Sequence, residues 1–235
     1  MNLILLLADD FIAPDQVVLR GRRLKHVRDV HRAEVGQSLC VGRLDGEIGR
    51  GEVTHLDEAG LAMTVVWESA PPPPLPLTLL LALPRPKVLR RVFVTAASMG
   101  VKKIVLFNAY RVEKSYWQSP ALTAEGIDES LHLGLEQGRD TVLPTVELRK
   151  RFRPFVEDEL PALLHESRGL VAHPYADQFC PRALQEHVTL AIGPEGGFIP
   201  FEVELLTAMG MTPVACGERI LRVEAAIPAL LGRLF

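Results

Sequence analysis

The sequence predicts an α/β fold in which a mostly parallel sheet follows a small β-barrel. Four consecutive prolines at 71–74 divide the 235 residues into a stretch of short β segments and a stretch of alternating strands and helices. Consecutive prolines favour a stiff extended chain, so they mark a domain boundary. Alternating strands and helices are typical of a parallel sheet with helices on both faces. We therefore expect a barrel domain over residues 1–70 and a second domain over 75–235.

The first 70 residues consist of short β segments separated by turns. Apolar and β-branched residues alternate or cluster over 39–42, 47–54 and 61–67, with turn signals at 45–46 and 58–60. The apolar start, residues 1–7, is short and lacks a basic region or cleavage site, so we interpret it as a strand rather than a signal peptide. A short helix is expected over 21–30.

Strands and helices alternate after the prolines. A continuous apolar strand is expected over 77–83, as in a sheet covered on both faces. Further strands are expected over 104–107, 145–148, 170–172, 188–192 and 213–216. The spacing of apolar residues predicts helices over 88–99, 122–137, 156–165, 201–209 and 223–234.

Two glycine-bearing loops follow strands of this second part. Gly193-Pro194-Glu195-Gly196-Gly197 ends the apolar run 188–192, and Gly217 follows Cys216. Glycine lets a backbone approach a ligand closely, and open α/β sheets bind ligands at the carboxyl ends of their strands. The first loop lacks the Gly-Lys-Ser/Thr ending of a triphosphate loop, and Glu195 would repel phosphate. A ligand with an amino group, such as S-adenosylmethionine, fits better; a plain strand-to-helix turn is the alternative.

Composition limits the classes of function. The formal net charge is −3, so no global basic field indicates nucleic acid, although local patches matter more than totals. Cys40, Cys180 and Cys216 are too widely separated for a zinc site or a disulfide framework and fit a reducing cytoplasm. The histidines lack metal-ligand spacing, so we expect no metal. No apolar run approaches the roughly 20 residues that span a membrane.

Basic residues nevertheless gather in two places. Six lie close together and only Asp29 opposes them, which is a plausible footprint for RNA phosphates: Arg20, Arg22, Arg23, Lys25, Arg28 and Arg32. The second group is Arg85, Lys87, Arg90 and Arg91. Segment 110–117 combines aromatic rings with cations and suits base stacking. The alternatives are a solvated face for each cluster, and packing against a partner subunit or the barrel for segment 110–117.

The carboxyl-terminal motifs resemble those of a known family. Gly193 to Phe198, a helix rich in Glu, and then Gly217-Glu218-Arg219-Ile220-Leu221-Arg222-Val223-Glu224-Ala225 are similar to ribosomal RNA small subunit methyltransferase E, of the SPOUT superfamily. Residues 81–84, 26–32 and 136–139 extend the resemblance over nearly the whole chain. The chain departs from the family where Val223 and Ala225 replace two threonines, and where one residue fewer separates Gln137 from Arg139.

The resemblance implies a methyltransferase that uses S-adenosylmethionine to methylate N3 of a uridine in 16S ribosomal RNA. It also implies a PUA-like barrel for RNA, a SPOUT-type trefoil knot in the catalytic domain and a homodimer, and the cysteines predict a cytoplasmic location. The cofactor would lie among three loops that contribute His173, Pro174, Ile192, Gly193, Pro194, Glu195, Gly196, Gly197, Cys216, Gly217, Ile220, Leu221 and Arg222. RNA would meet Arg22, Arg23, Lys25, Arg28, Arg32, Arg85, Lys87 and Arg139.

Uridine N3 is a poor nucleophile until it loses its proton. Arg222 is the candidate for stabilising the resulting anion, with an ion pair to Glu218 or Glu224 as the alternative. Glu195 and Glu224 are the candidate proton acceptors, with a surface or capping role as the alternative. We expect Glu136 to pair with Arg139, with RNA binding by these two residues as the alternative. Two other functions stay open: a SPOUT methyltransferase with another target, such as a ribose 2′-hydroxyl in transfer RNA, and a non-catalytic RNA-binding assembly protein.

Overall fold

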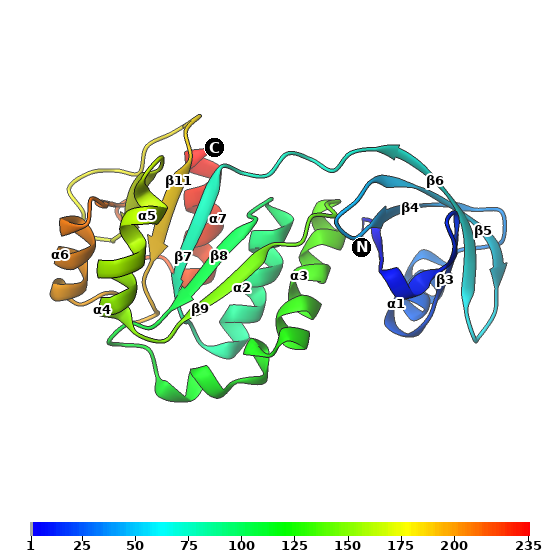
Figure 1. The fold of residues 1–235 in the computed structure, drawn as a ribbon, viewed down its shortest axis with the longest axis horizontal. Coiled ribbons are helices and arrows are strands. Elements are labelled where there is room, and N and C mark those ends of the chain that lie inside the picture. The colour runs from blue at the N-terminus through cyan, green and yellow to red at the C-terminus, as the bar shows by residue number, and fades with distance from the viewer. Residues whose placement is uncertain (1) are drawn as a thin grey trace. The chain divides into compact units, whose positions relative to one another are not determined.

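The computed structural model describes residues 2–235, which divide into two compact units (Figure 1). The first unit ends at Pro73, within the proline run, but it also includes residues 132–143. The second unit comprises residues 74–131 and 144–235. The expected domain 75–235 therefore differs from the second unit, because the end of helix α3 (Ala124–Gly138) and the segment after it belong to the first. The spacing of apolar residues predicts that a helix forms, but it does not indicate which hydrophobic core the helix packs against.

The first unit contains a curled six-stranded sheet. Its strand order is β1 (Ile4–Leu6), β4 (Ser38–Arg43), β5 (Ile48–Leu56), β6 (Leu61–Ser69), β3 (Gln16–Leu19) and β2 (Phe11–Ala13). Strands β1 and β4 are parallel, and the other neighbours are antiparallel. The strands expected over 39–42, 47–54 and 61–67 are confirmed. Strands β2 and β3 were not expected, because runs of three and four residues carry little periodicity.

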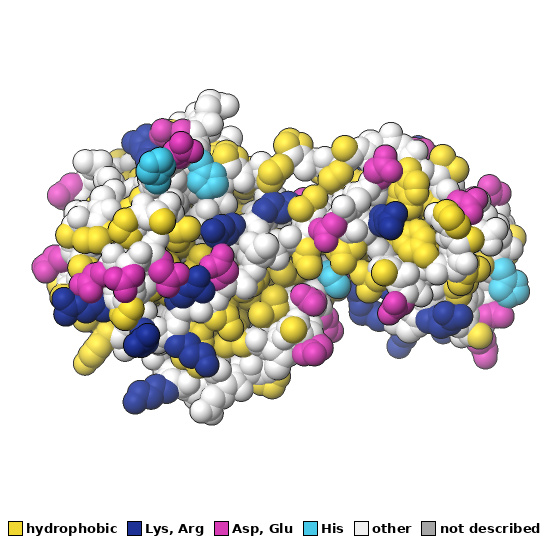
Figure 2. Space-filling view, in the orientation of Figure 1, with side chains coloured by type: hydrophobic (Ala, Val, Ile, Leu, Met, Phe, Trp, Pro, Cys, Tyr) yellow, Lys and Arg dark blue, Asp and Glu magenta, His cyan; other side chains and the backbone are white. Residues whose placement is uncertain are grey.

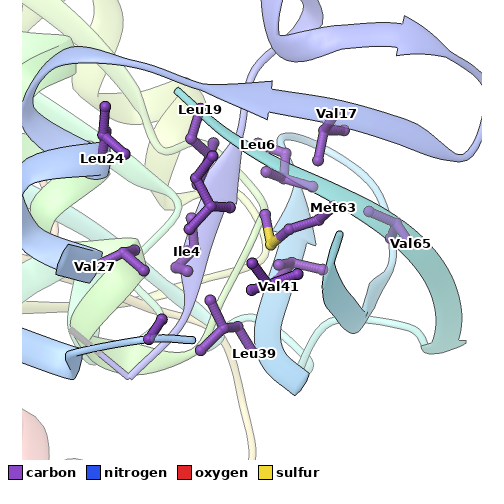
Figure 3. Packing of buried hydrophobic residues seen from close by; sticks show 13 residues of the cluster. Ile4, Leu6, Val17, Leu19, Leu24, Val27, Leu39, Val41, Met63 and Val65 are labelled. Atoms are coloured by element: carbon purple, nitrogen blue, oxygen red, sulfur yellow. The ribbon is translucent and has the colours of Figure 1, made fainter. Parts of the chain in front are cut away.

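One apolar core lies inside this curled sheet (Figure 3). Leu6, Leu19, Val41 and Met63 come from four different strands and point toward one another. Strand β6 buries every second residue over its first five positions, the pattern of a sheet with one covered face. Helix α1 (Gly21–His26) and the π-helical turn Val27–His31 add side chains to the same core and confirm the helix expected over 21–30.

The second unit contains a six-stranded sheet in which all neighbours are parallel. The order is β12 (Thr212–Val214), β10 (Arg168–Ala172), β11 (Val188–Ile192), β7 (Leu77–Ala82), β8 (Lys103–Phe107) and β9 (Thr145–Arg149). Every residue of β7 and β11 is buried, which explains their uninterrupted apolar sequences. The predicted α/β fold and its strand positions are confirmed.

Helices cover both faces of this sheet (Figure 1). Helices α2 (Pro86–Ser98) and α7 (Val223–Leu234) pack against each other on one face, and α4 (Phe152–Pro154) and α5 (Leu160–Leu164) lie on the other. Helix α6 (Pro200–Ala208) follows strand β11. The helix expected over 156–165 begins earlier, at Phe152, and contains a π-helical turn over Phe155–Glu159.

Surface charge is mixed over the second unit. Figure 2 shows acidic and basic side chains interspersed on its visible face, in keeping with the small net charge of −3. Within residues 2–235, helices are all too short or too polar to cross a membrane. The same residues contain no group of three or more His, Cys, Asp or Glu side chains suited to a metal ion.

Candidate functional site

A cavity of about 800 Å³ lies at the carboxyl edge of the parallel sheet. Three neighbouring strands, β12, β10 and β11, end at this cavity, and their last residues Val214, Ala172 and Ile192 line it. All strands of a parallel sheet end at one edge, and α/β proteins bind ligands there. The volume falls within the range of small-molecule sites. Loops that are distant in the sequence thus form one site.

The structure brings together the residues that the sequence placed at a cofactor. The lining includes His173, Pro174, Ile192, Gly193, Pro194, Glu195, Gly196, Gly197, Cys216, Ile220, Leu221, Arg222 and the candidate proton acceptor Glu224. Gly217 is the one expected cofactor residue that is not among the lining residues. Helices α2 and α7 complete the wall with Val88, Val223, Ala226 and Leu230.

The loop after β10 is tied to the end of β12. The backbone N–H of His173 donates to the carbonyl of Val214 at 2.9 Å. The ring of His173 meets the ring of Tyr175 edge to face, with centroids 6.0 Å apart. Tyr175 is 76% exposed although it lines the cavity, so it stands at the rim. The loop therefore contributes a fixed backbone and two aromatic rings to the lining of the cavity.

The loop after β11, residues 193–198, requires glycine for two different reasons. Gly197 has φ +73°, a left-handed conformation that other residues adopt at a cost. A Cβ on Gly196 would lie 2.9 Å from Cδ of Arg111, so the arginine stem occupies the space that a side chain would need. Both features account for glycine at positions 196 and 197 of the cavity wall.

Charged groups of both signs surround the cavity. Arg85, Arg111, Arg219 and Arg222 line it with Glu195 and Glu224. Glu195 Oε1 accepts the backbone N–H of Arg85 at 2.9 Å, which fixes this carboxylate at the start of α2. Arg222 stands at the amino end of α7, is exposed, and makes no ion pair with any residue in the range 2–235. The ion pair to Glu218 or Glu224 considered for Arg222 is therefore not formed.

Arg111, Arg219 and Tyr175 line the cavity but were not expected there. Segment 110–117 was expected to contact RNA or a partner, whereas the Arg111 guanidinium donates to the carbonyl of Gly196. The two residues are 85 positions apart, so no local sequence pattern could have predicted the contact. Tyr175 lies two residues after His173, and Arg219 directly precedes Ile220. Both therefore belong to loops that the sequence placed at the cofactor, and that position is the signal that indicates them.

Two of the basic residues expected at RNA are bound to buried carboxylates of the first unit. Both Arg22 guanidinium NH2 groups donate to Glu136 Oε2 at 3.1 Å, and the Arg23 guanidinium holds Asp10 with a contact of 2.7 Å. Glu136 and Asp10 are 2% and 6% exposed. Burial raises the pKa of Glu136, although the charge of Arg22 opposes this.

The prediction that Glu136 forms an ion pair with Arg139 is wrong. Arg139 follows the last residue of α3 with φ +55°, so it does not continue the helix above Glu136. Its guanidinium lies 3.5 Å from Cys40 Sγ. Lys25, Arg28, Arg32, Arg85 and Lys87 are exposed, and Arg28 forms a surface ion pair with Asp29 at 3.2 Å. Their contact with RNA stays a prediction.

Comparison with known proteins identifies the family. Residues 71–234 match the model of the RNA methyltransferase domain. Ribosomal RNA small subunit methyltransferase E of Treponema pallidum is 29% identical over 96% of this chain and 87% of its own length. The protein of that name from Mycobacterium bovis is 27% identical over 92% of this chain and 84% of its own length.

A solved structure shares the fold. The crystal structure of a ribosomal RNA small subunit methyltransferase E from Neisseria gonorrhoeae, bound to S-adenosylmethionine, covers 98% of this chain and 95% of its own, with a TM-score of 0.75 and 18% identity. The family model spans all six strands of the parallel sheet and the cavity loops. The chain belongs to the RNA methyltransferase domain family.

Proposed function

We propose that this protein is an S-adenosylmethionine-dependent methyltransferase that modifies N3 of a uridine in 16S RNA of the small ribosomal subunit. The family supports RNA methylation, and the name of the curated relatives supports the small subunit as substrate. The single observation that carries the proposal is the cavity itself. Loops after three adjacent parallel strands line it, and they contribute glycines, charged side chains and apolar side chains.

The residues at this cavity fit S-adenosylmethionine. The cofactor carries a carboxylate, an amino group, a sulfonium and an adenine ring, and the wall offers arginines, glutamates, backbone amides and apolar side chains. Residues 216–222 would hold the adenine through their backbone, with Leu221 against its apolar face.

Methyl transfer requires an ionised uracil whose N3 approaches the methyl group of the donor in line. When bound, S-adenosylmethionine supplies the electrophilic methyl group. Arg222 has no ion pair within the described residues, so its charge is available to stabilise the uracil oxygens as N3 loses its proton. Glu195 is engaged by the backbone of Arg85, so we assign it to the wall. Glu224, in the first turn of α7, is the candidate proton acceptor.

The partners follow from the same proposal. The 16S RNA would meet exposed cations of both units, among them Lys25, Arg28, Arg32, Arg85 and Lys87, and Arg139 is a further candidate. The first unit would act as a PUA-like RNA-binding domain, and the second as the knotted domain through which a homodimer forms. A cytoplasmic location accords with a ribosomal substrate.

The decisive experiment offers labelled S-adenosylmethionine to small subunits from a strain that lacks this protein. We expect label in 16S RNA at one uridine, with mass mapping placing the methyl group on the base. Label on a ribose would favour the 2′-hydroxyl alternative. Absence of both transfer and cofactor binding by calorimetry would favour a non-catalytic assembly protein.

A further inference from the structure

Glu202 is a buried carboxylate that lies behind the cavity wall and does not line the cavity. It is 2% exposed and stands in the first turn of α6. Its Oε2 accepts the backbone N–H of Ile199 at 2.9 Å, and its Oε1 accepts the backbone N–H of Tyr110 at 2.7 Å. Ile199 ends the glycine loop that follows β11, whereas Tyr110 belongs to the loop that follows β8.

One carboxylate therefore joins two loops from strands that are not neighbours. Strand β7 separates β11 from β8 in the sheet, so no ladder hydrogen bonds connect them. Hydrogen bonds from N–H groups to an ionised carboxylate are stronger than those to neutral acceptors, and burial strengthens them further. Both carboxylate oxygens are used, one for each loop.

A second contact joins the same two loops at the cavity itself. Arg111, the neighbour of Tyr110, donates to the carbonyl of Gly196, and its stem fills the space beside the Gly196 Cα. Arg111 and Gly196 both line the cavity. The Glu202 contact anchors the backbone of the β8 loop one residue before Arg111, so the two contacts form one latch.

We propose that Glu202 is a positioning residue of the methyl-donor site: by holding the loop after β8, it places Arg111 across residues 193–197 and sets the shape of the cavity wall. The inference rests on the proposed function for the identity of the ligand. Glu202→Gln keeps the size of the side chain but removes its charge and one of its two acceptor oxygens, so it should weaken S-adenosylmethionine binding about 10- to 100-fold.

Asp10 supplies a matched control in the other unit. It is also buried, and it also accepts a backbone N–H three residues earlier, that of Leu7 at 2.7 Å. Asp10→Asn should lower the temperature of unfolding without changing the dissociation constant for S-adenosylmethionine. Glu202→Gln should change that constant and, in the ligand-free protein, speed hydrogen exchange at the amides of Tyr110 and Ile199.

If the two contacts act as one latch, the effects of removing them on S-adenosylmethionine binding should not add. Arg111→Met removes the second contact on an exposed side chain, so the protein should fold normally and bind S-adenosylmethionine more weakly. The double variant should bind no more weakly than Glu202→Gln alone, because both changes release the same loop.

Two results would overturn the inference: unchanged binding and unchanged Tyr110 exchange in Glu202→Gln, or equal weakening by Asp10→Asn. Failure of the wild-type protein to bind S-adenosylmethionine would refute the proposed function instead. In that case hydrogen exchange at Tyr110 would still decide whether Glu202 holds the loop.

Discussion

Two arginines of helix α1 in the first unit and two arginines at the cavity of the second unit differ in what neutralises their charge. In the first unit, Arg22 and Arg23 are held by the buried carboxylates of Glu136 and Asp10. In the second unit, Arg111 is bound by a backbone carbonyl, and Arg222 has no ion pair within residues 2–235. A backbone carbonyl leaves the positive charge uncancelled, whereas a carboxylate cancels it. A run of cations in a sequence therefore does not reveal which of them remain available to an anion.

The first variant tests the structural role of Arg23. Its side chain is 16% exposed and that of Asp10 is 8% exposed, so Arg23→Ala leaves a buried carboxylate without its cation. We expect the free energy of unfolding to fall by about 3–5 kcal/mol. Urea denaturation measures it. Arg28→Ala, which breaks an exposed pair, should cost under about 1 kcal/mol. Equal losses in the two variants would contradict the comparison.

The second variant tests the available charge of Arg222. Arg222→Ala should lower kcat by about 10²–10³-fold, as does removal of a group that stabilises an oxyanion. Because the side chain is exposed and unpaired within residues 2–235, the free energy of unfolding should change by less than about 0.5 kcal/mol. Methyl-transfer kinetics on small subunits give kcat. Arg182→Ala, exposed and outside the cavity, is the matched control. Full activity in Arg222→Ala would remove this role.

The third variant tests the backbone of the cavity wall. Gly197→Ala places a side chain at φ +73°, which costs about 1–2 kcal/mol. The loop should shift, and S-adenosylmethionine should bind about five- to thirtyfold more weakly by calorimetry. Gly232 lies inside helix α7, and an added Cβ there would meet no other side chain or distant backbone atom of the described residues within 4 Å, so Gly232→Ala should leave binding unchanged and favour the helix. Equal binding by both variants would show that the left-handed turn is dispensable.

The smallest expected effect is a pH dependence of the first unit. Burial raises the pKa of Glu136 above its ordinary value of 4.5. Its contribution to stability is therefore complete below pH 4.5 and is lost as the pH rises through the raised pKa. Urea unfolding between pH 4 and 7 should show the wild type losing stability relative to Glu136→Gln as the pH rises.

His187 in the second unit provides the opposite case. Burial, assisted by the charge of Lys103, lowers the pKa of His187 below its ordinary value of 6.5. Its contribution is present above pH 6.5 and is lost as the pH falls through the lowered pKa. The wild type should therefore lose stability relative to His187→Gln as the pH falls. The same sign for Glu136 and His187 would contradict one of the two assignments.

Much of the fold was readable from local pattern. The continuous apolar runs at 77–83 and 188–192 predicted strands buried on both faces, and β7 and β11 are buried at every residue. The spacing of apolar residues predicted α2 and α7 to within about two residues. Strands β2 and β3 were not predicted because they are too short to show a repeating pattern. The end of α3 belongs to the first unit, and the apolar spacing of a helix does not indicate which core it packs against.

The sequence by itself determined the order of strands and helices, the glycine loops at the carboxyl ends of strands, and the family they resemble. These are local properties, set by side-chain periodicity and by glycine's freedom at turns. Only the tertiary structure decided which charges meet. Glu136 pairs with Arg22, 114 residues away, rather than with Arg139, and Tyr110 meets Glu202 across 92 residues. Such contacts depend on how separate elements pack, and no spacing along the chain encodes them.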